Sequence, residues 1–201
     1  MFETDSSAAS ESQPSSSVRP TAVDASVGRP PDPQQVDELA QQLTESCRHY
    51  EGHLTDREAS FLAILSACVP GTGVVLEIGS FKGRSTIVLS EAERQIFGRS
   101  RLVAVDPLTC PSETDPDIRG ADGTRDVFYA NLERAGIRSN VEFHEMLSGQ
   151  LAQEWDRPIR VLWIDGDHTY EGVSADIDGF AEYVEPGGVI ALHDVMHCEG
   201  V

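Results

Sequence analysis

The hydrophobic positions of this 201-residue chain follow a helical pattern before any strand pattern begins. A second amphipathic stretch opens at Thr55, and Glu58 follows three residues later, which is the spacing of a capping box. The Pro-Gly-Thr-Gly sequence at 70–73 ends this second predicted helix. The first predicted helix carries apolar residues three or four positions apart, so they share one face: Val36, Leu39, Ala40, Leu43 and Cys47.

Beyond position 73, short apolar runs alternate with helical stretches. The runs cover 74–78, 102–105, 141–143, 161–164 and 189–192, and helices are expected over 85–97, 125–135 and 172–184. Continuous apolar strands separated by helices indicate a parallel sheet covered on both faces. The predicted fold class is therefore α/β, a Rossmann-like, doubly wound and mainly parallel sheet. Ligands of such sheets bind beyond the carboxyl ends of the strands.

Composition divides the chain into two parts. Residues 1–33 are rich in Ser, Pro, Asp and Ala, so we expect a disordered tail, followed by one domain over 34–201. Acidic residues outnumber basic ones by 34 to 15, for a formal charge of −19. This charge disfavours nucleic acid and anionic membrane surfaces as partners and leaves a small molecule as the expected substrate. No apolar run approaches the roughly 20 residues that span a bilayer.

The four cysteines show no CxxC spacing, and no apolar leader follows Met1. Both features are typical of reduced thiols in a cytoplasmic protein.

The loop after the first strand contains Gly79 and Gly83, which allow a tight turn and close approach of a ligand. A nicotinamide enzyme would carry GxGxxG here, but Phe81 stands where the second glycine of that pattern would fall. Glu77 would suit a ligand ammonium better than a pyrophosphate. The second strand ends at Asp106, whose carboxylate could accept hydrogen bonds from ribose hydroxyls. A purely structural turn would explain the glycines equally well.

Ionisable side chains also follow the fourth and fifth strands. Asp165 is followed three residues later by His168, and the neighbouring strand ends in His193 and Asp194. Oxygen and imidazole groups at one sheet edge predict a divalent-cation site, with His168 in reach as a general base. A solvated turn before the next helix is the alternative. A zinc site built from His193 with the His-Cys pair at 197–198 has less support, because no second half of such a site occurs elsewhere.

Three separated segments carry a resemblance to a known family. Residues 74–80 are VVLEIGS, 164–173 are IDGDHTYEGV, and 186–195 are PGGVIALHDV. In this order they resemble class I S-adenosylmethionine-dependent methyltransferases, in the group related to cephalosporin hydroxylase and macrocin O-methyltransferase proteins. The resemblance covers about 54–195.

The resemblance implies roles for individual residues. Glu77, Gly79 and Gly83 would line the methionine part of S-adenosylmethionine, Asp106 would hold the ribose and Ser148 would lie near the adenine. His168 would be the catalytic base, and Mg²⁺ would be held by Asp165 and Asp194 with His193. The residues implied to bind the cofactor are Glu77, Gly79, Ser80, Gly83, Asp106, Ser148 and Asp165.

Two departures from the family pattern qualify this picture. His193 stands where many metal-binding relatives have a carboxylate. The sequence also stops where relatives continue with a helix and an antiparallel strand pair, so we expect a domain lacking its last strands. An uncovered fifth strand would expose an unpaired edge and apolar faces, so we expect association with a partner, such as a second copy in a homo-oligomer, or poor stability.

The expected function is O-methylation of a small-molecule hydroxyl on a sugar or natural-product intermediate, assisted by a divalent metal. The alternative is a catalytically weak cofactor-binding or interaction module. A nicotinamide oxidoreductase comes third.

Overall fold

The computed structural model describes residues 31–109 and 123–194. Most of the expected tail, the loop at 110–122 and the His-Cys pair at 197–198 lie outside these residues. Helix α1 spans Pro33–Cys47, and the side chain of Asp32 caps it by accepting from the amide of Gln34 at 2.9 Å. Helical structure among the described residues therefore begins at Pro33.

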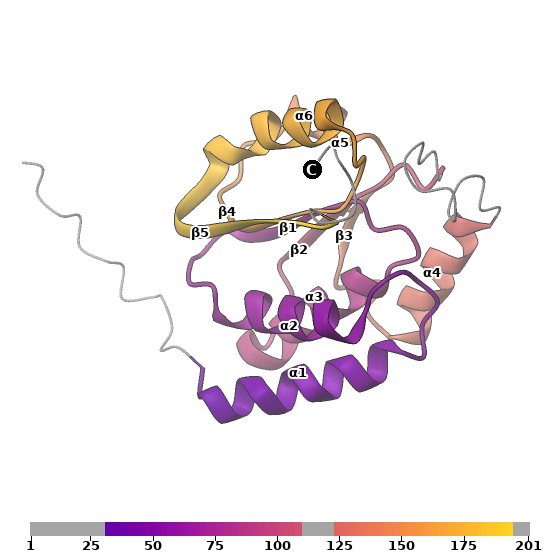
Figure 1. Cartoon of the computed structure of the whole chain (residues 1–201), viewed down its shortest axis with the longest axis vertical. Helices are drawn as coiled ribbons and strands as arrows, with labels where there is room; N and C mark the ends of the chain where they lie inside the picture. The colour runs from indigo at the N-terminus through magenta and orange to yellow at the C-terminus, as the bar shows by residue number, and fades with distance from the viewer. Residues whose placement is uncertain (1–30, 110–122, 195–201) are drawn as a thin grey trace, which may run out of the picture.

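Within residues 31–109 and 123–194, five parallel strands form one sheet in the order β3-β2-β1-β4-β5 (Figure 1). This confirms the predicted Rossmann-like α/β class. The strand order also places the first strand beside the second and the fourth beside the fifth, as the site prediction required. The strands are β1 (Val74–Ile78), β2 (Leu102–Val105), β3 (Glu142–His144), β4 (Ile159–Ile164) and β5 (Val184–Leu192).

Helices cover both faces of the sheet. Figure 1 shows α1, α2 and α3 on one side and α5 and α6 on the other. Two hydrophobic clusters correspond to these layers, and α4 joins the α1–α3 cluster through Phe128 and Leu132. No helix in the described ranges is both long and apolar enough to cross a membrane. The remaining helices are α2 (Asp56–Cys68), α3 (Arg84–Phe97), α4 (Thr124–Arg134), α5 (Ser148–Ala152) and α6 (Tyr170–Phe180).

The last elements differ from the sequence prediction at their bounds. The α-helix predicted to reach position 184 ends at Phe180, and a 3₁₀ turn continues over Ala181–Tyr183. Strand β5 starts five residues earlier than expected and includes the Pro-Gly-Gly segment at 186–188. The register between β5 and β4 shifts between Ile159 and Val161. Strand β5 pairs with one strand among those described, and a proline is tolerated in such an edge strand where the pairing is irregular.

A buried ion pair ties the helical layer to the sheet. Arg160 of β4 and Glu93 of α3 are both fully buried, with Arg160 Nη2 2.6 Å from Glu93 Oε1. The guanidinium also donates to the carbonyl oxygens of Val69 and Ser66 at the end of α2, at 2.9 and 2.7 Å. One side chain therefore connects β4, α2 and α3.

Removing one charge of this pair should destabilise the fold strongly. We expect Glu93→Met to lower the free energy of unfolding by roughly 3–5 kcal/mol, because it leaves the Arg160 guanidinium buried without its counter-charge. The double variant Glu93→Met with Arg160→Met should lose less free energy of unfolding than Glu93→Met alone. Urea unfolding measures both, with Arg48→Met in the exposed pair with Asp56 as control. A loss in Glu93→Met no larger than in the control would contradict this account.

Candidate functional site

The backbone hydrogen bonds of the parallel sheet continue one residue beyond the strands and fix the positions of the site residues. The backbone amides of Gly79, Asp165 and His193 donate to the last residues of β2, β1 and β4, at 3.0, 2.8 and 3.0 Å. Asp106 occupies the same position after β2 and donates to the last residue of β3 at 3.2 Å. These four residues, far apart in sequence, therefore stand side by side along the carboxyl edge of the sheet.

The turn after β1 needs glycine at two points. Gly79 has φ +85°, and a Cβ there would lie 2.1 Å from the carbonyl oxygen of Asp165. Gly83 has φ +83° and precedes α3, where a Cβ would lie 2.7 Å from Leu132 Cδ1. Gly79 lines the cavity described below, but Gly83 packs against α4 instead. Gly83, which was expected to line the cofactor, is not among the described residues that line this cavity, and its lack of a side chain lets α3 pack closely against α4.

Glu77 also differs from its expected place. Its side chain is fully buried, and its carboxylate accepts from the hydroxyls of Ser80, Ser85 and Thr86 at 3.1, 2.5 and 2.6 Å. Burial raises the pKa of Glu77 to about 7, although the three hydroxyl hydrogen bonds lower it. The carboxylate is thus turned away from the cavity and ties the turn to the first residues of α3. Ser80, expected at the cofactor, is buried in this same network.

Asp106 holds the other side of the same turn. Its Oδ2 accepts from the amides of Ser80 and Phe81 at 2.7 and 2.8 Å, and its Oδ1 accepts from the amide of Leu108 at 2.6 Å. Burial raises the pKa of Asp106, while these backbone donors lower it. Phe81 keeps a left-handed conformation, φ +47°, and lines the cavity. The sequence prediction used Phe81 only to exclude a GxGxxG loop and missed its place in the site.

A cavity of about 530 Å³ lies at this edge of the sheet. Of the residues expected to bind the cofactor, Gly79, Asp106, Ser148 and Asp165 line it. Its described lining carries four carboxylates and contains neither lysine nor arginine. The acidic residues are Asp106, Asp165, Asp167 and Asp176.

Asp176 was not among the predicted site residues. Ser148 Oγ, at the start of α5, donates to Asp176 Oδ1 at 2.5 Å, and burial is the main cause that raises the pKa of Asp176. Asp176 shares the buried face of α6 with Val173 and Phe180. A carboxylate at a core position of an amphipathic helix was the sequence signal that could have revealed it.

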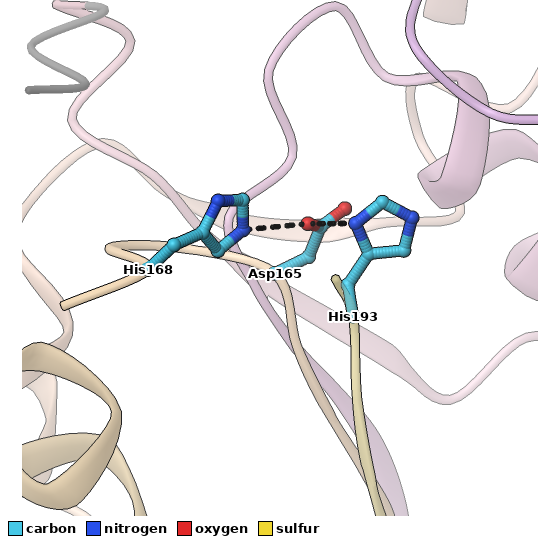
Figure 2. A group of neighbouring side chains, drawn as sticks. All are labelled: Asp165, His168 and His193. Carbon is cyan, nitrogen blue, oxygen red and sulfur yellow. Dashed lines mark hydrogen bonds and ion pairs between the residues drawn. The ribbon is translucent and has the colours of Figure 1, made fainter. Parts of the chain in front are cut away.

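Two histidines meet one carboxylate, that of Asp165 (Figure 2), and Asp165 also lines the cavity. His193 Nδ1 and His168 Nε2 lie 2.9 and 3.3 Å from the same oxygen, Asp165 Oδ1. Asp194 Oδ2 lies 3.2 Å from His193 Nδ1 and 3.8 Å from His168 Nδ1. The structure therefore brings together all four residues that the sequence prediction grouped here.

A fifth residue, Glu58 of α2, reaches this cluster. Its Oε1 lies 3.2 Å from His193 Nε2. Burial alone lowers the pKa of His193, but Asp165, Asp194 and Glu58 outweigh it and raise that pKa to about 9. The hydrogen bond to Asp165 is the main cause that raises the pKa of His168. The sequence indicated Glu58 only as a helix cap, so its place at the site was missed.

The residues present fit a divalent cation. Ligand atoms of Asp165, His168 and His193 all lie within 4.8 Å of one another. His168 Nδ1 and both ring nitrogens of His193 are buried without an aligned hydrogen bond in the described structure, although carboxylate oxygens are near. Buried polar atoms of this kind require a partner. Imidazole nitrogens beside carboxylates suit Mn²⁺ or Zn²⁺ better than Mg²⁺, which prefers oxygen ligands.

The chain matches a family described as a methyltransferase domain over residues 76–195, which is more than half of its length. It belongs to this family. The expected membership of the class I S-adenosylmethionine-dependent methyltransferases is thereby confirmed. The matched region starts in β1 and includes Asp106, Asp165 and His193.

Solved structures share the fold at low sequence identity. The O-methyltransferase NovP matches with a TM-score of 0.59 and 16% identity over 82% of this chain and 85% of that chain. An O-methyltransferase from Bacillus cereus in complex with SAH matches with a TM-score of 0.51 and 22% identity, over 81% of this chain and 66% of that chain. The SAH-bound methyltransferase PaMTH1 of Podospora anserina matches with a TM-score of 0.55 and 13% identity, over 78% of this chain and 62% of that chain. The chain thus spans less than two thirds of the length of the last two proteins.

The buried carboxyl of Glu77 should make stability depend on pH. Its pKa of about 7 in the fold lies above its ordinary value of 4.5, so the native state holds more protons between these pH values. The free energy of unfolding then falls as pH rises through this window, by up to about 1.4 kcal/mol per pH unit for one proton.

The variant Glu77→Gln removes this contribution. Its free energy of unfolding relative to the parent should therefore rise between pH 4.5 and pH 7. Denaturant unfolding at several pH values measures the difference, with Glu51→Gln at an exposed position as control. A difference that stays constant with pH would show that Glu77 titrates normally.

Proposed function

We propose that the chain binds S-adenosylmethionine in the cavity and transfers its methyl group to a hydroxyl of a small molecule. The observation that carries this proposal is the charge of the cavity, which has four carboxylates and neither lysine nor arginine in its described lining. S-adenosylmethionine presents a sulfonium and an ammonium, both positive. The pyrophosphate of a nicotinamide dinucleotide would meet carboxylates there without a compensating cation, which argues against the oxidoreductase alternative.

Asp106 and Ser148 would orient the adenosyl part. A carboxylate offers roughly four acceptor positions, and backbone amides occupy three of those on Asp106. We therefore assign Asp106 one remaining acceptor position, on Oδ1, for a ribose hydroxyl. Ser148 already donates its proton to Asp176, so its oxygen is left as an acceptor facing the cavity.

The histidine cluster would handle the proton of the acceptor hydroxyl. When bound, S-adenosylmethionine supplies the electrophilic methyl group, and a cation held by Asp165, His193 and Asp194 supplies Lewis-acid polarisation of the acceptor oxygen. Asp165 would keep the His168 proton on Nε2, which leaves Nδ1 to take the hydroxyl proton. Asp194 would then stabilise the imidazolium from 3.8 Å. His168 lies behind the cavity lining, at 9% exposure, so the acceptor has to reach it past Asp165.

Binding of the cofactor tests the first part. Calorimetry should detect S-adenosylmethionine binding that Asp106→Asn weakens by roughly 1–3 kcal/mol, as for loss of a charged hydrogen-bond partner. Asp178→Asn, exposed on the far side of α6, is the matched control. Preferential binding of a nicotinamide dinucleotide would contradict the assignment. Tight cofactor binding without turnover on any hydroxyl acceptor would support the alternative of a cofactor-binding module.

Turnover tests the second part, with release of S-adenosylhomocysteine as the signal and hydroxylated sugars and natural-product intermediates as acceptors. A chelator should abolish turnover, and Mn²⁺ should restore it better than Mg²⁺, because the site contains imidazole. Full activity in excess chelator would eliminate the metal.

His168→Ala should slow turnover by roughly 10²–10⁴-fold, the usual contribution of a positioned base, and should keep cation affinity. The exposed His49→Ala is the control. Loss of cation affinity in His168→Ala would instead make His168 a metal ligand, an arrangement in which its nitrogen is unavailable as the base.

A further inference from the structure

Glu58 connects the start of α2 to the end of β5. Its Oε2 accepts from the amide of Thr55 at 2.7 Å, and the hydroxyl of Thr55 accepts from the amide of Glu58 at 3.3 Å, so the predicted capping box is present. The second carboxylate oxygen, Oε1, is not used by the cap and lies 3.2 Å from His193 Nε2. One side chain thus caps the start of a helix and faces an imidazole of the candidate metal site.

The two nitrogens of His193 face different surroundings. Nδ1 faces the carboxylates of Asp165 and Asp194, at 2.9 and 3.2 Å. Nε2 is buried and has Glu58 as its ion-pair partner. The ring also meets Trp163 edge to face and His168 at a tilt, with centroids 5.5 and 6.3 Å away. Among the described residues, Glu58 is therefore the carboxylate placed to act on the nitrogen that points away from Asp165.

When a cation binds an imidazole, the ring is neutral, and the hydrogen bond made by the other ring nitrogen sets which nitrogen keeps the proton. A carboxylate at Nε2 favours the proton there and leaves the Nδ1 lone pair for a cation. Such partners behind a metal-bound histidine fix its ring and raise its basicity. The cap limits the freedom of Glu58, because Oε2 is already held by the Thr55 amide.

We propose that Glu58 is a positioning residue that keeps the His193 proton on Nε2 and so presents Nδ1 to a divalent cation beside Asp165. This inference rests on the proposed function, in which His193 is a cation ligand. Nothing in the capping role of Glu58 alone requires a carboxylate oxygen on the side of His193.

The variant Glu58→Gln separates the two roles. Its amide oxygen can still accept from the Thr55 amide, so the cap is kept, while its NH₂ group is left facing His193 Nε2. An NH₂ group donates, so it favours a bare Nε2 and moves the ring proton to Nδ1, where it blocks the cation. Thr55→Ala is the opposite control, because it removes the hydroxyl half of the cap and leaves Glu58 in place.

Zn²⁺ alone serves as the probe, by calorimetry on the whole chain. We expect Glu58→Gln to lower Zn²⁺ affinity by roughly 10–100-fold, the usual effect of losing a partner behind a metal ligand. Thr55→Ala should lower the melting temperature but leave Zn²⁺ affinity within about twofold, because the partner behind His193 is retained. In the Zn²⁺-loaded parent, ¹⁵N NMR should place the His193 proton on Nε2, with the signal identified by its loss in His193→Gln.

Each contrary result has a distinct meaning. Unchanged Zn²⁺ affinity in Glu58→Gln, or a His193 proton on Nδ1 in the Zn²⁺-loaded parent, would overturn the role of Glu58 and leave the proposed function standing. A parent that binds no Zn²⁺ would overturn both this proposal and the metal part of the function. Cofactor binding, measured separately through Asp106, would be unaffected.

Discussion

The parallel register of β1, β4 and β5 is the constraint on which the site depends. Asp165 reaches its position because its amide donates to the last residue of β1, and His193 because its amide donates to the last residue of β4. The fit at this edge leaves no space for a side chain at Gly79. A shift of one residue in either pairing would turn these side chains to the opposite face of the sheet. The catalytic proposal is therefore a consequence of strand pairing as much as of residue type.

Acidic side chains at the cavity and paired charges in the core lie in different parts of the fold. Carboxylates gather at the carboxyl edge of the sheet, where they face the cavity and the two histidines. Elsewhere, the buried charges of Arg160 at the start of β4 and Glu93 of α3 balance each other. Like charges held close together destabilise a fold unless a cation or a positively charged ligand compensates them. The site thus has an electrostatic demand for a positively charged ligand or cation.

Much of this could be predicted from the sequence, for physical reasons. Apolar runs separated by helical stretches were sufficient for the fold class, and strand-end positions were sufficient to bring Asp165, His168, His193 and Asp194 together. The direction of a side chain was harder to predict. Glu77 was expected at the cofactor, but nearby hydroxyls draw its carboxylate into the interior.

Contacts between elements distant in sequence also escaped prediction. The capping box at Thr55 was recognised, yet nothing local to that motif shows that the free oxygen of Glu58 meets a strand more than a hundred residues later. Asp176 is similar, because its hydrogen bond to Ser148 joins two helices through the cavity wall. Local patterns predict elements and the residues at their ends, whereas packing decides which polar atoms then meet.

The central claim is that the acidic cavity is a site for S-adenosylmethionine. A crystal structure of the chain grown with saturating S-adenosylhomocysteine and Zn²⁺ tests it most directly. We expect the adenosyl part between Asp106 and Ser148, the amino acid part near Gly79, and a metal ion between Asp165 and His193. Nucleoside density elsewhere on the molecule, or an empty cavity at saturating ligand, would contradict it.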